Sequence, residues 1–204
     1  LDSKVIKSAI KDIITGSDRL KTYISNIVDT SRLTEAAGTK LDKVTMVNLS
    51  KLVRERTSRY KKTFLDDKHK AQFKLMVDQD LMVECNEHYI TQLLDNLISN
   101  ADKYSESSLI KISLRRMNSI MVKFKITDHG IGIPKEELSD IFKSFTTSSK
   151  TRTSAGGRGL GLALCQKVID AHQGKILAES DNENGTTFLF VIPIHYHYKA
   201  LWLK

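Results

Sequence analysis

The chain has few cysteines and no long apolar run, and these shortages exclude several classes of protein. Its 204 residues include only two cysteines, Cys85 and Cys165, which lie far apart and among apolar neighbours. We expect buried free thiols, because secreted domains held by disulfides use many closely spaced cysteines. No apolar run approaches the roughly 20 residues that a helix needs to span a bilayer. These features predict a soluble, globular, cytoplasmic protein.

The chain also lacks a metal-binding motif and a targeting sequence. No group of cysteines and histidines has the spacing of a metal-ligand motif. The first residues, Leu1-Asp2-Ser3-Lys4, contain neither an initiator methionine nor the apolar core of a signal peptide. We therefore expect the chain to be a fragment or a processed product of a longer protein. The sequence leaves open whether that parent protein is anchored in a membrane.

An excess of positive charge is spread over the whole chain. Its 32 lysines and arginines outnumber its 24 acidic residues, which gives a net charge of +8. Such an excess can indicate binding to nucleic acid or to a membrane surface. However, no predicted helix carries a dense basic stripe. We therefore expect a solvated basic surface and no nucleic-acid partner.

A glycine-rich segment stands out from the rest of the chain. Residues 155–164 read Ala-Gly-Gly-Arg-Gly-Leu-Gly-Leu-Ala-Leu, and the apolar pattern continues through Val168-Ile169. Glycines let a ligand approach the backbone closely, and the first turn of a helix offers unpaired N–H groups with partial positive charge. A glycine loop that leads into a helix therefore predicts an anion site, most often for phosphate. The alternative for this segment is a mobile hinge.

Residues 1–33 repeat apolar and small side chains in a seven-residue rhythm. The spacing alternates between four and three residues, which places these side chains along one side of a helix. We call this set the seam; it consists of Ile6, Ile10, Ile13, Ser17, Leu20, Ile24, Ile27 and Ser31. One helix cannot bury such a face alone. We favour a dimerising helix bundle over packing against the globular part of the same chain.

The rest of the chain predicts alternating helices and strands. Asn48 or Ser50 can cap a helix over residues 51–62, and Asn86 can cap a helix that ends near Tyr104. The apolar alternation predicts strands at residues 72–77, 81–85, 109–116, 120–127, 175–180 and 186–193. We also expect a turn at residues 78–80, a short helix from Pro134 to Phe142, a mobile lid at residues 146–158 and a glycine-loop helix to His172.

The predicted helix over residues 86–104 has an apolar face and a separate polar face. The apolar positions have helical spacing and are Ile90, Leu93, Leu94, Leu97, Ile98 and Ala101. Asn96, Asn100 and Lys103 lie three or four residues apart and therefore share another face. Asparagine is not favoured inside a helix. The two asparagines are either simply solvated or, because they are in register with a lysine, have a polar task, which is the interpretation we favour.

Four sequence motifs in a fixed order identify a family that this chain resembles. They are residues 96–105 (Asn-Leu-Ile-Ser-Asn-Ala-Asp-Lys-Tyr-Ser), 128–132 (Asp-His-Gly-Ile-Gly), 142–145 (Phe-Lys-Ser-Phe) and 157–162 (Gly-Arg-Gly-Leu-Gly-Leu). Together they closely resemble the ATP-binding domain of sensor histidine kinases, whose superfamily includes the ATPase domains of type II topoisomerases and mismatch-repair proteins. The resemblance implies an α+β fold, a two-layer sandwich whose mixed, mostly antiparallel sheet has helices on one face.

The resemblance also divides the chain into parts. Residues 46–194 correspond to the ATP-binding catalytic domain. Residues 1–38 look like the second helix of the dimerisation and phosphotransfer hairpin, and residues 195–204 form a tail without a clear pattern. The implied partners are ATP, a second copy of the chain and the receiver domain of a response regulator.

The first motif implies the residues that hold Mg²⁺ and phosphate. In the family, the position of Asn100 ligates Mg²⁺, an ion that prefers oxygen ligands. Lys103 can meet a phosphate as a point charge, and Asn96 supports the same polar face. Asn100 and Lys103 are therefore the expected catalytic residues. Tyr104 can lie against the base or the ribose, or it can belong to the core.

The other motifs imply contacts to the base and to the phosphates. Asp128 is expected to accept a hydrogen bond from the exocyclic amine of adenine. Lys150 and Arg152 lie in the predicted lid and either touch a phosphate or remain solvated. The remaining expected ligand-binding positions are Gly130, Gly132 and Ile133 near the base, and Gly157, Arg158, Gly159, Leu160 and Gly161 near the phosphates. Phe142 and Phe145 are expected to anchor the lid rather than to touch nucleotide.

No histidine of this chain fits the phosphate acceptor of the family. The acceptor lies on the first helix of the hairpin and is typically followed by an acidic residue. None of the six histidines is followed by Asp or Glu, and none lies in the N-terminal helix. The resemblance therefore implies a kinase domain whose acceptor histidine lies on an upstream helix. Asn96 stands where related ATPases place a glutamate that activates water, so phosphotransfer fits better than hydrolysis.

Two alternatives remain at the level of sequence. The chain could be a non-catalytic module that dimerises, senses nucleotide or supports dephosphorylation of a response regulator. It could also be an ATPase linked to DNA, for which the positive charge argues, whereas Asn96 and the lack of a transducer domain argue against it.

Overall fold

A computed structural model describes residues 3–35, 41–63, 72–105, 109–151, 159–181 and 185–196. The helices are α1 (Ser3–Glu35), α2 (Leu49–Thr63), α3 (Glu87–Tyr104) and α4 (Gly161–Ala171), with short 3₁₀ turns η1 (Lys135–Glu137) and η2 (Ser149–Thr151). The strands are β1 (Thr45–Asn48), β2 (Gln72–Val77), β3 (Met82–Cys85), β4 (Leu109–Arg116), β5 (Met121–Thr127), β6 (Lys175–Ser180) and β7 (Thr186–Pro193).

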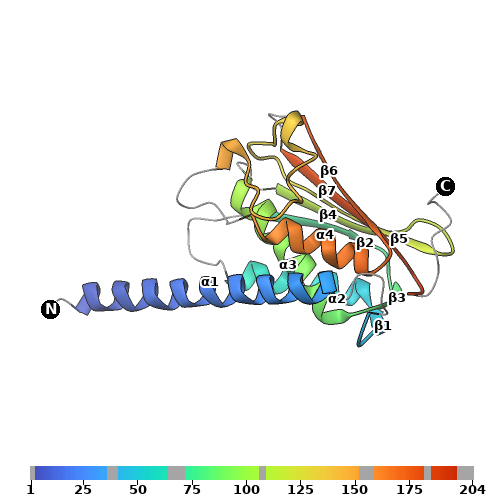
Figure 1. Cartoon of the computed structure of the whole chain (residues 1–204), viewed down its shortest axis with the longest axis horizontal. Coiled ribbons are helices and arrows are strands. Elements are labelled where there is room, and N and C mark those ends of the chain that lie inside the picture. The colour runs from blue at the N-terminus through green and yellow to red at the C-terminus, as the bar shows by residue number, and fades with distance from the viewer. Residues whose placement is uncertain are drawn as a thin grey trace.

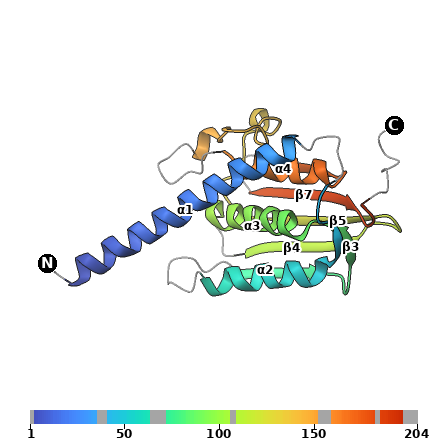
Figure 2. The same cartoon turned by 60° about the horizontal axis from the view of Figure 1, so that its bottom comes forward.

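Five strands form one sheet that carries helices on one face (Figures 1 and 2). The strand order is β2-β4-β5-β7-β6. Only β2 and β4 pair in parallel, whereas the other neighbours are antiparallel. Helices α2, α3 and α4 pack against this sheet. The predicted α+β sandwich with a mixed, mostly antiparallel sheet is therefore confirmed.

The core lies between the sheet and these helices. Phe124 of β5 faces Phe190 of β7 across the ladder, and their rings stack with centroids 4.9 Å apart. Such offset pairs add to the free energy gained from burying the rings. Both cysteines are buried and free, as predicted, and burial raises the pKa of the Cys85 thiol to about 12.

Helix α3 forms as its sequence predicts. The Asn86 side chain accepts a hydrogen bond from the Tyr89 N–H at 3.1 Å and so satisfies one unpaired donor of the first turn. All six predicted apolar positions of α3 are fully buried. Asn48 likewise caps α2, since its Oδ1 accepts from the Lys51 N–H at 2.9 Å. The Asn86 cap and the buried apolar stripe together hold α3 so that its polar face points away from the core.

Three local features differ from the sequence-based expectation. Strand β1 was not predicted, because four residues are too few for a clear alternation. The two strands around residues 78–80 do not pair with each other: β2 joins the large sheet, and β3 pairs with β1 in a separate two-stranded sheet. The helix expected from Pro134 to Phe142 is reduced to the 3₁₀ turn η1.

Helix α1 presents its seam to solvent. The large apolar residues of the seam are between 43% and 70% exposed. A different side of α1 is buried at Asn26, Asp29 and Leu33, where the C-terminal half of the helix lies beside α4 (Figure 2). The helix thus packs on the globular part through a face outside the seam, and dimerisation through the seam stays a prediction. None of the helices in the described ranges is long and apolar enough to cross a membrane.

Candidate nucleotide-binding site

A cavity of about 240 Å³ lies between α3, the segment after β5 and the start of α4. It brings together ten of the residues expected at the ligand site from three separate segments of the chain. These residues are Asn96, Asn100, Lys103, Tyr104, Asp128, Gly132, Ile133, Gly159, Leu160 and Gly161. Gly130 and Lys150 lie outside the lining of this cavity, and Arg152, Gly157 and Arg158 lie outside the described residues.

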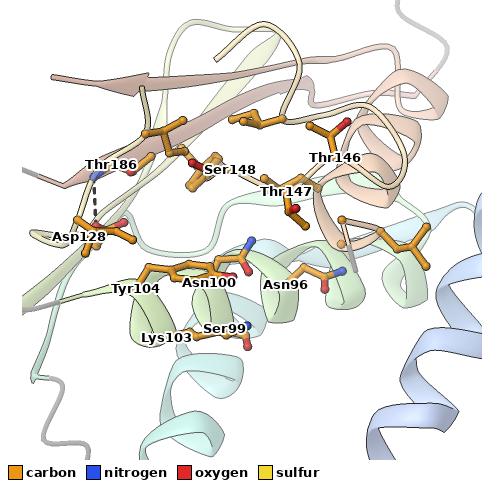
Figure 3. A pocket seen from close by; sticks show the side chains of 18 of the residues that line it. Asn96, Ser99, Asn100, Lys103, Tyr104, Asp128, Thr146, Thr147, Ser148 and Thr186 are labelled. Atoms are coloured by element: carbon orange, nitrogen blue, oxygen red, sulfur yellow. Dashed lines mark hydrogen bonds between the residues drawn. The ribbon is translucent and has the colours of Figure 1, made fainter. Parts of the chain in front are cut away.

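Asp128 is a buried carboxylate at one end of the cavity (Figure 3). Only 4% of the residue is exposed, and its Oδ1 accepts the N–H of Gly130 at 3.0 Å and the N–H of Thr186 at 3.1 Å. Burial raises the pKa of this carboxyl above its usual range, and the two backbone N–H groups act against that rise. The side chain is therefore held in one orientation with one oxygen left for a ligand.

The polar residues of α3 are arranged along the floor of the cavity. Figure 3 shows Tyr104, Asn100 and Asn96 in a row that leads away from Asp128. Lys103 lies on a lower flank of the helix, and its Nζ is 5.0 Å from the centroid of the Tyr104 ring. Amide oxygens can ligate Mg²⁺, and amide N–H groups can bind phosphate, so this row offers both functions.

Gly130 joins the segment after β5 to the end of α3. A Cβ at this position would lie 1.8 Å from the carbonyl oxygen of Tyr104, and Gly130 forms a β-bridge with Ser105. Gly130 therefore permits close backbone packing beside the cavity instead of lining it. The end of α3 and the Asp128 segment are positioned relative to each other by this contact.

Replacing Gly130 with alanine is expected to lower the melting temperature by several degrees and to weaken nucleotide binding. The new methyl group would overlap the Tyr104 carbonyl, so α3 and the Asp128 segment must separate. Thermal unfolding and calorimetric titration with Mg·ADP measure the two effects. Gly16→Ala is the matched control, because a Cβ on Gly16 meets nothing within 4 Å and alanine favours the helix. Equal melting temperatures of Gly130→Ala and the parent would contradict the expectation.

The glycines before α4 bring the backbone into the cavity. Gly159 has a φ of +69°, and a Cβ there would lie 2.3 Å from the Thr146 carbonyl oxygen. Gly161 begins α4 directly against Asn96, whose Oδ1 would lie 3.0 Å from an added Cβ. The first turn of α4 therefore lies in the wall of the cavity, where its N–H groups can bind an anion.

The lid contributes in a way that the sequence only partly predicts. The hydroxyl residues Thr146, Thr147 and Ser148 line the cavity (Figure 3), although the sequence pattern indicated only a polar, mobile segment. Lys150 donates from Nζ to the carbonyl oxygen of Ile131 at 2.9 Å, so it fastens the lid beside the cavity. A Thr/Ser-rich run next to a ligand motif is the signal that could have identified these residues.

The two phenylalanines of the third motif behave differently. Phe142 packs edge-to-face against Phe188 of the core, as expected for an anchor of the lid. Phe145 is 72% exposed and has a φ of +63°, so the expectation that it anchors the lid is wrong in this conformation. The Phe145 N–H donates to the Gly159 carbonyl at 3.0 Å, which shows that the backbone is held here while the ring is not.

Helix α1 also lines the cavity, which the sequence did not predict. Thr22, Tyr23 and Asn26 form part of its wall. The seven-residue rhythm of α1 indicates the seam, and these three residues lie outside it. Their contribution depends on how α1 packs on α3 and α4, for which the sequence contains no local signal.

Known proteins are similar to this chain in both sequence and fold. Residues 85–196 match the family described as histidine kinase-, DNA gyrase B- and HSP90-like ATPase. The sensor histidine kinase WalK of Bacillus subtilis is 37% identical over 139 residues, which cover 67% of this chain and 23% of WalK. The chain thus spans about a quarter of the length of this relative.

Solved structures give the same result. The nucleotide-free catalytic domain of the histidine kinase ThkA is 33% identical, with a TM-score of 0.66, over 76% of this chain and 97% of that domain. ThkA in complex with the response regulator TrrA is 30% identical, with a TM-score of 0.71, over 96% of this chain and 53% of that one. With more than half of its length matched by the family and nearly all of the ThkA domain covered, this chain belongs to the histidine kinase family and contains its ATP-binding catalytic domain.

Proposed function

We propose that this chain is the kinase half of a two-component sensor that transfers the γ-phosphoryl group of Mg·ATP to a histidine on another helix. The observation that carries the proposal is a cavity that joins a buried carboxylate, Asp128, to the start of α4. Adenine and phosphates need these two kinds of partner, a hydrogen-bond acceptor and N–H donors, at opposite ends of one site. A response regulator is the proposed downstream partner, since ThkA forms a complex with TrrA.

Each residue of the row on α3 has a proposed role. Tyr104, which lies nearest Asp128, contacts the base or ribose, and Asn100 ligates Mg²⁺ through its amide oxygen. Lys103 stabilises a phosphate from the flank of α3, and Gly159 and Gly161 allow the triphosphate to approach the backbone. Mg²⁺ would neutralise the charge that develops during transfer, while these residues position the nucleotide.

The chemistry of Asn96 favours transfer over hydrolysis. Asn96 lies in the cavity beside Gly161, at the position where a carboxylate would act as a base for water. An amide cannot accept a proton from water at neutral pH. We therefore propose that bound ATP is held without rapid turnover until an acceptor histidine reaches it. The seam of α1 is the proposed surface for the partner helices that bring this histidine.

The proposal is tested first by calorimetric titration with the non-hydrolysable analogue AMPPNP, with and without Mg²⁺. The unsubstituted chain, called the parent in these tests, is expected to bind AMPPNP more tightly with Mg²⁺ than without it. In Asn100→Ala the affinity for Mg·AMPPNP is expected to fall at least tenfold, because a ligand of Mg²⁺ is removed. Asn118→Ala is the control, since Asn118 lies in the β4–β5 turn, outside the cavity lining. A parent that binds no nucleotide would overturn the proposal.

The transfer step is tested in a chain that carries the histidine helix as well as the residues described here. Incubation with ATP labelled in the γ-phosphate is expected to give label that is stable to base and labile to acid, as phosphohistidine is. Rapid release of free phosphate stimulated by DNA would instead favour a DNA-linked ATPase. If the chain binds AMPPNP but no label is transferred to the protein, the function that remains is that of a nucleotide-sensing module.

A further inference from the structure

Helix α1 closes the cavity at the end that lies away from Asp128. The β-bridge between Ser105 and Gly130 places the C-terminal end of α3 beside the Asp128 segment. Asn96 lies eight residues earlier, about 12 Å along the helix, and the N-terminal half of α3 is where α1 docks. Figure 3 accordingly shows Asp128 and the α1 ribbon on opposite sides of the row on α3. A nucleotide whose base contacts Asp128 therefore directs its terminal phosphate toward α1.

Asn26 is the residue of α1 that best fits a terminal phosphate. Only 6% of Asn26 is exposed, and the residue lines the cavity together with Asn96 and Gly161. The side-chain atoms that are enclosed without a partner in the described residues belong to other residues, so the Asn26 amide is accessible from the cavity that it lines. The two N–H groups of this amide are donors of the kind that a phosphate oxygen accepts.

A separate contact holds α1 in this position without any nucleotide. Asp29, one turn after Asn26, is 4% exposed and accepts hydrogen bonds from Gln92 Nε2 at 2.7 Å and from Ser25 Oγ at 3.0 Å. His88 Nε2 lies 3.8 Å from the same carboxylate. Because Gln92 belongs to α3, this carboxylate is directed toward α3, and Asp29 is not part of the cavity lining. The wall at Asn26 is thereby pre-arranged for a ligand.

We propose that docked α1 forms the terminal-phosphate wall of the site and that the Asn26 amide binds the γ-phosphate, so that the site distinguishes nucleoside triphosphate from diphosphate. This inference rests on the proposed function, because it requires the base to lie at Asp128. The diphosphate ends short of α1, whereas the triphosphate reaches it. Occupancy by ATP is then coupled to the position of α1, the helix that carries the seam.

The test compares dissociation constants for Mg·AMPPNP and Mg·ADP in the 204-residue chain by calorimetry. Asn26→Ala is expected to weaken AMPPNP binding at least tenfold, as the loss of a hydrogen bond to a charged group does, and to change ADP binding less than twofold. Asn26→Asp keeps the shape but adds a negative charge, so it is expected to weaken AMPPNP further than alanine does. Ile27→Ala, on the exposed seam, is the matched control and is expected to change neither.

A second variant tests the docking of α1 separately from the contact. Gln92→Ala removes a donor to Asp29 without altering the cavity lining, and it is expected to reduce the preference for AMPPNP over ADP. An unchanged AMPPNP-to-ADP ratio in Asn26→Ala and Asn26→Asp, or equal weakening of both nucleotides, would overturn the inference. If the parent binds ADP, the proposed function stands whatever the Asn26 variants show. If the parent binds neither AMPPNP nor ADP, both this inference and the proposed function are overturned.

Discussion

Asp128→Asn is expected to weaken nucleotide binding roughly 100-fold while leaving the folded domain intact. The Oδ1 atom already accepts two backbone N–H groups, so the amide oxygen of asparagine will take its place. The amide NH₂ then occupies the position of the free carboxylate oxygen and faces the exocyclic amine of adenine, donor against donor. Losing a charge-assisted hydrogen bond and leaving two donors unpaired costs about 3 kcal/mol.

The melting temperature of Asp128→Asn without nucleotide shows whether its loss of affinity comes from the missing contact or from unfolding of the domain. Burial raises the pKa of Asp128 in the folded state, so its ionised form lowers the free energy of unfolding at neutral pH. The neutral amide is therefore expected to leave the melting temperature unchanged or to raise it. Calorimetry with Mg·AMPPNP and thermal unfolding without ligand measure the two quantities. The control is Asp170→Asn, because Asp170 is an exposed carboxylate on α4. If Asp128→Asn and Asp170→Asn bind Mg·AMPPNP with equal affinity, Asp128 does not contact the base.

Acidification from pH 6.5 to pH 4 is expected to destabilise the domain through His172. This buried imidazole accepts the Asn86 N–H on Nε2 at 3.0 Å, so the proton must be on Nδ1, which donates to the Val168 carbonyl at 2.7 Å. Burial lowers the pKa of His172 to about 4 from its usual 6.5. Below pH 6.5 the unfolded chain therefore binds a proton that the folded chain does not. The difference amounts to about 3 kcal/mol once the pH reaches 4.

Urea unfolding at a series of pH values measures this loss. His172→Gln is expected to be less stable than the parent at pH 7 but to lose less stability between pH 6.5 and pH 4, because glutamine does not titrate. His195→Gln is the control, since His195 is exposed on the surface. The carboxylates with lowered pKa values, such as Asp78, lose their contribution only as the pH falls below about 4, outside this window. A parent and a His172→Gln variant with parallel pH profiles would refute the assignment.

The effect at His172 also bears on the nucleotide site. Its Nε2 holds the N–H of Asn86, the residue that caps α3 and that also donates from Nδ2 to the Asp42 carbonyl at 2.8 Å. Protonation of the ring would break the first of these contacts at the start of the helix that carries Asn96, Asn100 and Lys103. Weaker nucleotide binding is therefore expected to accompany the loss of stability at low pH.

Much of the fold could be predicted because its signals are local. The cap at Asn86 and the six apolar positions of α3 lie within one helix, and the strands of the antiparallel pairs β4–β5 and β6–β7 alternate with a period of two. Strand pairing was predicted less well, because it joins residues far apart in the chain. β2 and β3 have suitable patterns and a turn between them, yet each buries its apolar side against a different partner.

The sequence by itself determined the family, the class of fold and the ligand motifs, because motif order, helix caps and apolar periods are properties of short segments. Only the tertiary structure decided that Gly130 packs against Tyr104, that Phe145 is exposed and that Thr22, Tyr23 and Asn26 of α1 complete the cavity. These outcomes depend on which faces meet when helices dock. A helix surface can offer two usable faces, here the seam and the side with Asn26 and Asp29, and packing against α3 and α4 selects between them.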